Sequence, residues 1–344
     1  MELLKGITLL LAALTAFSLF SRYAPKGTKA MGGLASAAVA SFLVEAVHAY
    51  ISGDFLGIDM LRETGLAAGS MGGPAAAALV ALALGVNPVF ALVAAIATKG
   101  TGILAGFIAG YICSFMADAI EKYLPEGIDV IVGALVLAPF AYMIAHAAGP
   151  IVGDLMAIIG SAITGATTAS PYVMGFVLGG LIKMICTSPL SSMALTAILG
   201  LTGLPMGIAA LACVGGSFTN GILMKRLKLG NNNKVIAIML EPLTQADIVT
   251  RNAFKIYSCN FFGGAFAGLA AVYFNIINDA PGTAAPIPGL LAPFAFNDAS
   301  TVLMAVFFAI IGGIIAGYVG TSIHIKLDQK RVKKAVNLQT ATVN

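Results

Sequence analysis

Five ionisable residues stand inside apolar stretches of the sequence, where their side chains are candidates for chemistry. Apolar stretches of about 20 residues are typical of membrane spans. An ionisable group at the centre of a bilayer costs about 2.5–3.5 kcal/mol on insertion scales, so it needs a polar partner, a water-filled cavity or a position near the membrane surface. Groups held in this way can bind a solute or pass on a proton. The five residues are Glu45, His48, Lys99, Lys183 and Glu241.

Glu45 and His48 are three residues apart in one apolar stretch. On an α-helix this spacing places both side chains on one face, where a carboxylate and an imidazole can share a proton. We predict that the pair couples ion or proton movement to the function of the protein. The alternative is that both lie near the outer end of their helix and are solvated beside the 53–63 loop.

Lys99 interrupts another apolar stretch, between Thr98 and the sequence Gly100-Thr101-Gly102. The pattern predicts that the helix breaks here. Backbone groups freed at membrane depth are tolerated only where they are buried in protein or line a cavity. We therefore predict that Thr98, Lys99 and Thr101 contribute to a substrate site. A glycine-packed helix contact is the alternative.

A second polar interruption is predicted over residues 215–221, which contain Ser217, Thr219 and Asn220. Uncharged hydrogen-bonding groups suit a hydroxylated ligand, so these three are also predicted to bind substrate. Helix packing through glycine is again the alternative. Lys183 lies four residues from the end of its apolar stretch, and we expect its side chain to extend to the cytoplasmic membrane surface.

The segment 235–248 is apolar at both ends, with Glu241 and Pro242 between them. A residue that precedes proline avoids the helical region, so Glu241 is expected in an extended or turn conformation. Such a conformation presents its carboxylate and the neighbouring carbonyls to a cavity. We predict that Glu241, Pro242 and Thr244 bind substrate.

The overall composition requires a membrane environment for these residues. Of 344 residues, 59% are hydrophobic and 10% are charged, whereas about 25% are charged in an ordinary soluble domain. The four cysteines stand singly in apolar stretches, which predicts neither a metal site nor a disulfide framework. The net charge of +4 comes from clusters beside the apolar runs, so it indicates orientation and not nucleic-acid binding. No cofactor is expected.

Eleven apolar runs predict an all-α, polytopic membrane protein of about 10–11 transmembrane helices. Two of the runs, 151–168 and 190–204, are short or rich in glycine and proline, and are candidates for re-entrant hairpins. The runs are 6–21, 31–52, 65–85, 89–113, 128–148, 151–168, 171–187, 190–204, 206–224, 256–278 and 301–324.

Three basic clusters predict the orientation of these runs, because cytoplasmic loops carry an excess of Lys and Arg. With all three clusters inside, the C-terminus is cytoplasmic, and the 53–63 loop, the 118–127 turn with its acidic residues and the 279–299 loop are outside. The acidic residues of the turn are Asp118, Glu121 and Glu126. The clusters are Arg22, Lys26 and Lys29; Lys225, Arg226, Lys228 and Lys234; and Lys326, Lys330, Arg331, Lys333 and Lys334.

A weak internal repeat accompanies these runs. Spacings of 14 and 14 residues in the first copy correspond to 16 and 16 in the second. The copies lie five runs apart, and an odd offset inverts the second relative to the first, as in many secondary transporters. Chance recurrence in an apolar chain is the alternative. The repeated positions are Pro74, Pro88 and Gly102 in one copy, and Pro189, Pro205 and Gly221 in the other.

The pair Glu241-Pro242 resembles the Glu-Pro of the Gly-Ile-x-Glu-Pro signature of sugar IIC proteins, the membrane components of bacterial phosphotransferase systems. The Pro-Ile-Pro-Gly-Leu-Leu-Ala-Pro-Phe loop at 286–294 and the stretch 215–228 add to the similarity, which covers most of the chain. Within that group the chain is similar to the compact branch that contains perfringolysin O regulator-like proteins. Ile238 stands where the signature has glycine, which weakens any transfer of sugar specificity.

The resemblance implies a homodimeric, elevator-type permease for a small polar solute, sugar-like or organic, in which Glu241 binds substrate hydroxyls. One membrane domain over residues 1–324 would be followed by a basic cytoplasmic tail over 325–344. The chain has three histidines and no soluble region to hold a phosphorylation site, so phosphate transfer would need separate IIA and IIB partner proteins.

A sensor, an intramembrane enzyme and a channel are the alternatives to a permease of the cell membrane. A membrane sensor of gene expression would use the basic tail and the 225–234 loop to contact a cytoplasmic partner. An intramembrane enzyme is not expected, because no His-Glu-x-x-His motif, paired aspartates or Ser/His arrangement is present. A channel also uses broken helices and glycine-rich segments, so the sequence does not separate it from a transporter.

Overall fold

The computed structural model describes residues 1–125, 127–188 and 191–341, and over these residues the chain is helical and without strands. The predicted all-α, polytopic fold is confirmed. Seven helices in this part of the chain are long and apolar enough to cross a membrane, or eight if one bent pair counts as a single span. Many large apolar side chains are exposed on their outer faces, as expected for surfaces that contact lipid.

The N-terminal half contains long, bent and short helices. It consists of α1 (Glu2–Tyr23), α2 (Gly27–Ala38), the π-helical segments η1 (Val39–Leu43) and η2 (Ala46–Phe55), α3 (Asp59–Ser70), α4 (Gly72–Leu84), α5 (Pro88–Ala97), α6 (Ile103–Tyr123) and α7 (Ile128–Ala169).

The C-terminal half alternates long helices with short ones. It consists of α8 (Pro171–Thr187), α9 (Ser192–Ile198), α10 (Gly203–Arg226), α11 (Asn232–Leu240), the 3₁₀ segment η3 (Pro242–Gln245), α12 (Ala246–Arg251), α13 (Ala253–Tyr273), α14 (Pro286–Leu291), the 3₁₀ segment η4 (Ala292–Ala295) and α15 (Ala299–Ala341).

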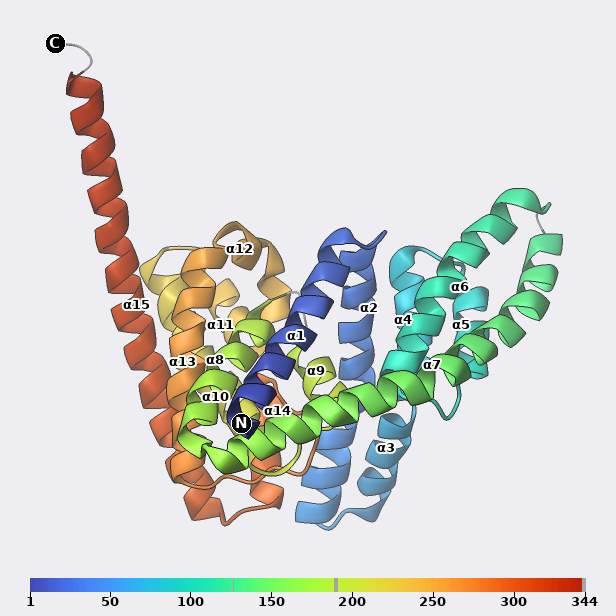
Figure 1. Ribbon diagram of the computed structural model, residues 1–344, viewed down its shortest axis with the longest axis horizontal. Helices are drawn as coiled ribbons and strands as arrows, with labels where there is room; N and C mark the ends of the chain where they lie inside the picture. The colour runs from blue at the N-terminus through green and yellow to red at the C-terminus, as the bar shows by residue number, and fades with distance from the viewer. Residues whose placement is uncertain (126, 189–190, 342–344) are drawn as a thin grey trace.

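Four helices of the C-terminal half, α8, α10, α13 and α15, form a closely packed bundle, at the left in Figure 1. Gly175 and Gly179 on α8 face Gly264 and Gly268 on α13, and an added Cβ at any of the four would press against the other helix. Small residues four apart let two helix backbones approach, which favours helix association in lipid. At the centre of the bundle lies α10, whose span is 89% buried.

Helices α2, α4, α5 and α6 form a second group, at the right in Figure 1. Here the chain is interrupted twice: α3 and α4 meet at an angle of 58°, and residues 98–102 separate α5 from α6. The helix break predicted at Lys99 is therefore confirmed. Helix α5 ends at Ala97, and two residues after its C-cap Thr98 the chain turns at Gly100 with a φ of 82°, a left-handed conformation that glycine adopts without strain.

Helix α7 crosses the width of the molecule and connects the two groups (Figure 1). Its 42 residues are one helix, so the separate runs predicted at 128–148 and 151–168 are wrong, as is a re-entrant hairpin at 151–168. Pro150 removes one backbone hydrogen bond. The helix nevertheless continues, because α1 packs on the following turns, with Gly6 against Ala162 and Ala166. A helix of this length measures about 63 Å, twice the hydrocarbon thickness, so it crosses obliquely.

The 118–127 turn lies on the opposite side from the one predicted. The Lys26 ammonium forms an ion pair with Asp118 at 3.0 Å, so this turn and the basic cluster at 22–29 share one side of the molecule. The cause is α5, whose ten residues return only part of the way through the bilayer, so that α6 leads back to the same side. Glu126 of this turn lies outside the described residues.

Helix α15 runs through the predicted boundary between residues 324 and 325 and ends at Ala341. In Figure 1 its C-terminal part projects beyond the body, on the same edge as the junction between α1 and α2. The basic tail is therefore the end of a membrane-spanning helix. On this edge Lys255 on α13 forms an ion pair with Asp328 on α15 at 2.6 Å.

Candidate functional site

Glu241 lies at a tip between two short helical segments. The Asn231 side chain accepts a hydrogen bond from the Lys234 amide and starts α11, which ends at Leu240 because proline follows Glu241. Glu241 has an extended backbone, with φ −145° and ψ 97°, as predicted. Its carbonyl accepts hydrogen bonds from the Thr244 amide at 3.1 Å and the Thr244 hydroxyl at 2.8 Å, which closes the turn.

The central helix α10 fixes this tip from one side. The Ser217 hydroxyl donates to the Met239 carbonyl at 2.7 Å, two residues before Glu241. Pro242 is buried at the start of η3, whereas Thr244 is exposed. The structure thus brings Ser217, Glu241 and Pro242 together, as the sequence predicted, while the Thr244 hydroxyl is used in closing the turn.

Lys183 on α8 belongs to the same neighbourhood, and its predicted extension to the membrane surface is wrong. Its side chain is completely buried, and its Nζ has no hydrogen-bond partner. The lysine stem lies along glycines: an added Cβ at Gly216 on α10 or Gly264 on α13 would overlap it. These glycines leave room for a long side chain inside the bundle, which prevents it from reaching the surface.

Two thiols and a hydroxyl belong to the same buried neighbourhood as Lys183. Cys186 on α8 and Cys213 on α10 interact through their side chains, and Ser192 at the start of α9 hydrogen-bonds to both. The charge of Lys183 acts on both thiols, and the Glu241 carboxylate acts on Cys186. Ser192 also donates to the carbonyl of Ala284 at 2.5 Å. Lys183 is thus the buried charged member of this cluster, and the half-buried Glu241 carboxylate acts on the cluster from the tip.

The predicted polar interruption at 215–221 is not a break, because α10 is continuous from Gly203 to Arg226. The Thr219 hydroxyl donates to the Gly313 carbonyl on α15 at 2.8 Å. The Asn260 amide on α13 donates to the Asn220 side-chain oxygen at 2.7 Å. These side chains therefore join α10 to α15 and α13. The glycines of this segment also pack against neighbouring elements, as the alternative expected, and substrate binding by Ser217, Thr219 and Asn220 stays a prediction.

The polar groups of the 98–102 break bond mainly within it. The Thr98 hydroxyl lies 3.0 Å from the carbonyls of Ala94 and Ala95, and Thr101 donates to the Thr98 carbonyl at 2.8 Å. The side chain of Lys99 is exposed. The break packs on the bend between α3 and α4, where an added Cβ at Gly73 would overlap Thr101.

A cavity of about 220 Å³ lies beside this break. Gly102 and Ala105 line it from α6, Met156 from α7, and Ala197 and Ile198 from α9. The start of α9 carries Ser192 of the lysine cluster, so this seven-residue helix connects the two neighbourhoods. The lining is mostly apolar, with backbone groups exposed at the break.

Glu45 and His48 do not meet as predicted, and no hydrogen bond joins them among the described contacts. The chain there is π-helical, with hydrogen bonds closed five residues apart instead of four, so a spacing of three no longer places two side chains on one face. The Glu45 carboxylate lies against Gly69 at the end of α3. The Nδ1 atom of His48 is buried without a hydrogen-bond partner.

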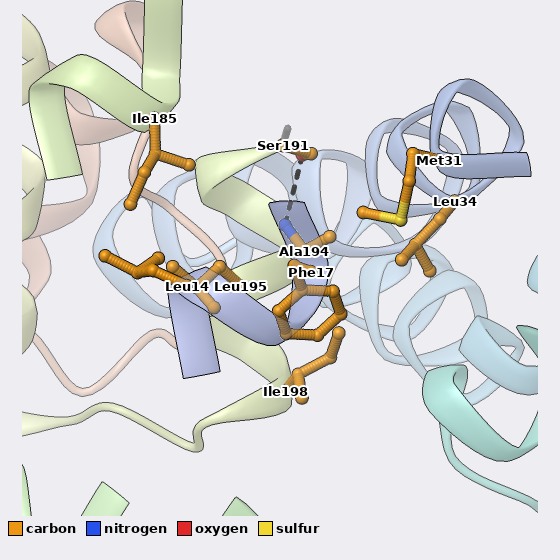
Figure 2. Close-up of a pocket in the computed structure, with 9 residues that line it drawn as sticks. All are labelled: Leu14, Phe17, Met31, Leu34, Ile185, Ser191, Ala194, Leu195 and Ile198. Atoms are coloured by element: carbon orange, nitrogen blue, oxygen red, sulfur yellow. Dashed lines mark hydrogen bonds between the residues drawn. The ribbon is translucent and has the colours of Figure 1, made fainter. Parts of the chain in front are cut away.

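Figure 2 shows where α9 packs against the N-terminal helices α1 and α2. Phe17 of α1 and Met31 of α2 face Leu195 and Ile198 of α9 across an apolar crevice of about 10 Å³, room for about one water molecule. Ser191 starts α9 by accepting a hydrogen bond from the Ala194 amide at 3.2 Å. The contact is narrow and mostly apolar, so it positions α9 and does not form a polar binding site.

Taken together, a bundle of candidate membrane spans and an extended, proline-terminated tip between short helices define a polytopic helical membrane protein. The family model described as "Phosphotransferase system, EIIC" matches residues 28–336. The chain therefore belongs to this family, whose members are the membrane permease components of the system. No curated protein and no solved structure matches the chain.

Proposed function

We propose that this chain carries a small polar solute, sugar-like or organic, across the cell membrane, and that the solute binds at the Glu241 tip. The observation that carries the proposal is the extended Glu241, held beside Ser217 and a buried charged cluster. An extended backbone places the Glu241 carboxylate at the turn between two helical segments, and such irregular backbone at membrane depth is typical of a binding site.

The same geometry supports an elevator-type movement. The tip, α9 and α8 share one cluster, and the crevice where α9 faces α1 and α2 is lined by apolar side chains apart from Ser191. Apolar contacts without hydrogen bonds are non-directional, so one group of helices can shift against another at low cost. We propose that the α8–α15 bundle moves with the solute relative to α1, α2 and α4–α7, within a homodimer.

The bend of α3 and α4, the 98–102 break and Glu45 form a second neighbourhood, joined to the first by α9. We propose that Thr98, Lys99 and Thr101 shape the solute path there, and that Glu45 and His48 couple ion or proton movement. The projecting basic end of α15 would face the cytoplasm, where IIA and IIB proteins would dock.

Exchange of the Glu241 carboxylate for an amide tests the binding site. We expect a panel of sugars, polyols and sugar acids to contain at least one solute that raises the melting temperature of the wild type. Glu241→Gln should abolish this shift because an amide both loses the charge and gains a donor. The four buried cysteines make a thiol-reactive dye a suitable reporter of unfolding.

The matched control is Glu63→Gln, an exposed position on α3 where the same exchange should leave the shift intact. Retention of the full shift by Glu241→Gln would remove Glu241 from the site. Uptake of the same solute into proteoliposomes then separates a transporter from a membrane sensor, which would bind the solute without flux.

A further inference from the structure

The buried Lys183 is not explained by binding of a neutral solute. A lysine ammonium taken out of water costs several kcal/mol unless a counter-charge and hydrogen bonds compensate for it. Lys183 is completely buried, its Nζ has no hydrogen-bond partner, and the ion pairs of the described residues do not include it. Among the described residues, the ammonium therefore has neither an ion pair nor a hydrogen-bond acceptor.

The bundle is shaped around this lysine. Gly216 on α10 and Gly264 on α13 both lie where any larger side chain would displace the lysine stem. A leucine or methionine would fill the same space at lower cost, because apolar replacements of buried charges are often neutral or stabilising. A lysine held at this cost is more readily explained by a ligand than by packing.

The position of the ammonium connects it to the solute site. The lysine stem lies against Gly216 on α10, and the next residue, Ser217, donates to the Met239 carbonyl two residues before Glu241. The charge of Lys183 and the Glu241 carboxylate also both act on Cys186. A solute held by Glu241 through its hydroxyls would thus have a buried cation within reach of its other end. The thiols and Ser192 are uncharged neighbours that do not compete for that cation.

We propose that the solute is a hydroxylated carboxylate, such as a sugar acid, whose carboxylate binds Lys183 while its hydroxyls bind at Glu241. This assignment rests on the proposed permease function and adds the charge of the substrate to it. The solute carboxylate supplies the missing counter-charge of Lys183. The loaded site then holds the solute carboxylate, the Lys183 ammonium and the Glu241 carboxylate. A neutral sugar of the same size would leave the ammonium unpaired.

Matched solute pairs test the assignment on the full-length protein. Gluconate is compared with sorbitol, and glucuronate with glucose, by titration in the thiol-dye melting assay. We expect the wild type to bind the acid of at least one pair ten times or more tighter than its neutral partner. Lys183→Met should weaken binding of that acid at least tenfold, and Ser258→Ala, at a hydroxyl elsewhere in the bundle, should leave it unchanged.

Stability without solute gives an independent measurement. Because Lys183→Met removes an unpaired buried charge, its melting temperature should equal or exceed that of the wild type. A marked fall in this temperature, or failure of Lys183→Met to fold, would assign the lysine a structural role and overturn the proposal. Equal binding of acid and neutral partners would overturn it as well.

The outcomes separate this proposal from the permease itself. Binding of neutral solutes that depends on Glu241 but not on Lys183 would support the permease function. The same result would refute the proposal that the substrate is acidic. Binding of neither member of any pair to a folded wild type would count against both.

Discussion

Residues 88–102 and helix α10 are both rich in glycine and small apolar residues, yet the first segment is broken and the second is continuous. In the first, Gly100 has a left-handed φ of 82° and an added Cβ would meet open space. In α10, Gly215 has a regular helical environment but lies directly against α15, near Ala309 and Gly313. Glycine thus ends a helix in one region and joins two helices in the other.

This difference separates a rigid region from an adaptable one. In α10 nearly every residue is buried, and its polar side chains are used by neighbouring helices. The 98–102 break has exposed residues and a cavity beside it. Regions with few buried contacts open more easily than packed helices. We therefore expect substitutions in α10 to act on folding, and substitutions in the break to act mainly on local conformation.

The largest effect is expected where α10 meets α15. Gly313→Ala places a methyl group against the Gly215 carbonyl. Backbone atoms cannot move aside without separating the two helices, so we expect a loss of about 1–3 kcal/mol, the range found for overpacked cores. Thermal unfolding in detergent, followed by the thiol-reactive dye, measures this loss.

Gly32→Ala on α2 is the matched control, because the added Cβ there meets nothing within 4 Å. This substitution should be neutral or should stabilise the protein by up to about 1 kcal/mol, since alanine is the better helix former. If Gly313→Ala were as harmless as Gly32→Ala, α10 and α15 would not be packed as closely as described here.

Local rules predicted the elements that depend on neighbours in sequence. Proline after Glu241 fixed the extended tip, and the Lys99-Gly100 sequence correctly indicated the break. Rules of the same kind failed at Pro150, where packing of α1 kept α7 continuous. Nothing in the sequence indicated that the chain would reverse after the ten residues of α5, so that α6 returns to the side from which α5 began.

The candidate site was predictable at Glu241, Pro242 and Ser217 but not at Lys183. Its distance from the end of an apolar run suggested a surface position. What places it inside is the pair of glycines at 216 and 264, which lie 33 and 81 residues further along the chain. Glycine pairs on several helices, such as those at 215–216 and 263–264, were a signal that a large side chain from another helix fills the space between them.

A smaller effect than that of Gly313→Ala is expected for the buried amide pair within the rigid region. Asn220→Leu leaves the Asn260 amide without its acceptor inside the bundle. A buried group left unsatisfied costs about 1–3 kcal/mol, and hydrogen bonds between membrane helices contribute about 0.6 kcal/mol on average, so we expect a loss of about 1 kcal/mol. The double variant Asn220→Leu with Asn260→Leu should recover part of the loss, because neither polar partner remains.

The same variants decide whether Asn220 belongs to the solute site. If it only joins α10 to α13, solute affinity should be restored in the double variant together with stability. Affinity that stays low in a double variant with recovered stability would place Asn220 in contact with the solute, as the sequence first predicted.

The smallest effect is expected in the adaptable region, from the pair Gly100→Ala and Gly102→Ala. Both positions have open space around the added Cβ, so only backbone conformation distinguishes them. Gly100 is left-handed, and alanine there costs about 1–2 kcal/mol at most, whereas Gly102 has a φ of −72° that alanine adopts freely. Gly100→Ala should therefore lower the melting temperature slightly and Gly102→Ala should not. Equal melting temperatures of the two variants would contradict this prediction. They would mean that the 98–102 break adopts another backbone conformation without any cost in stability.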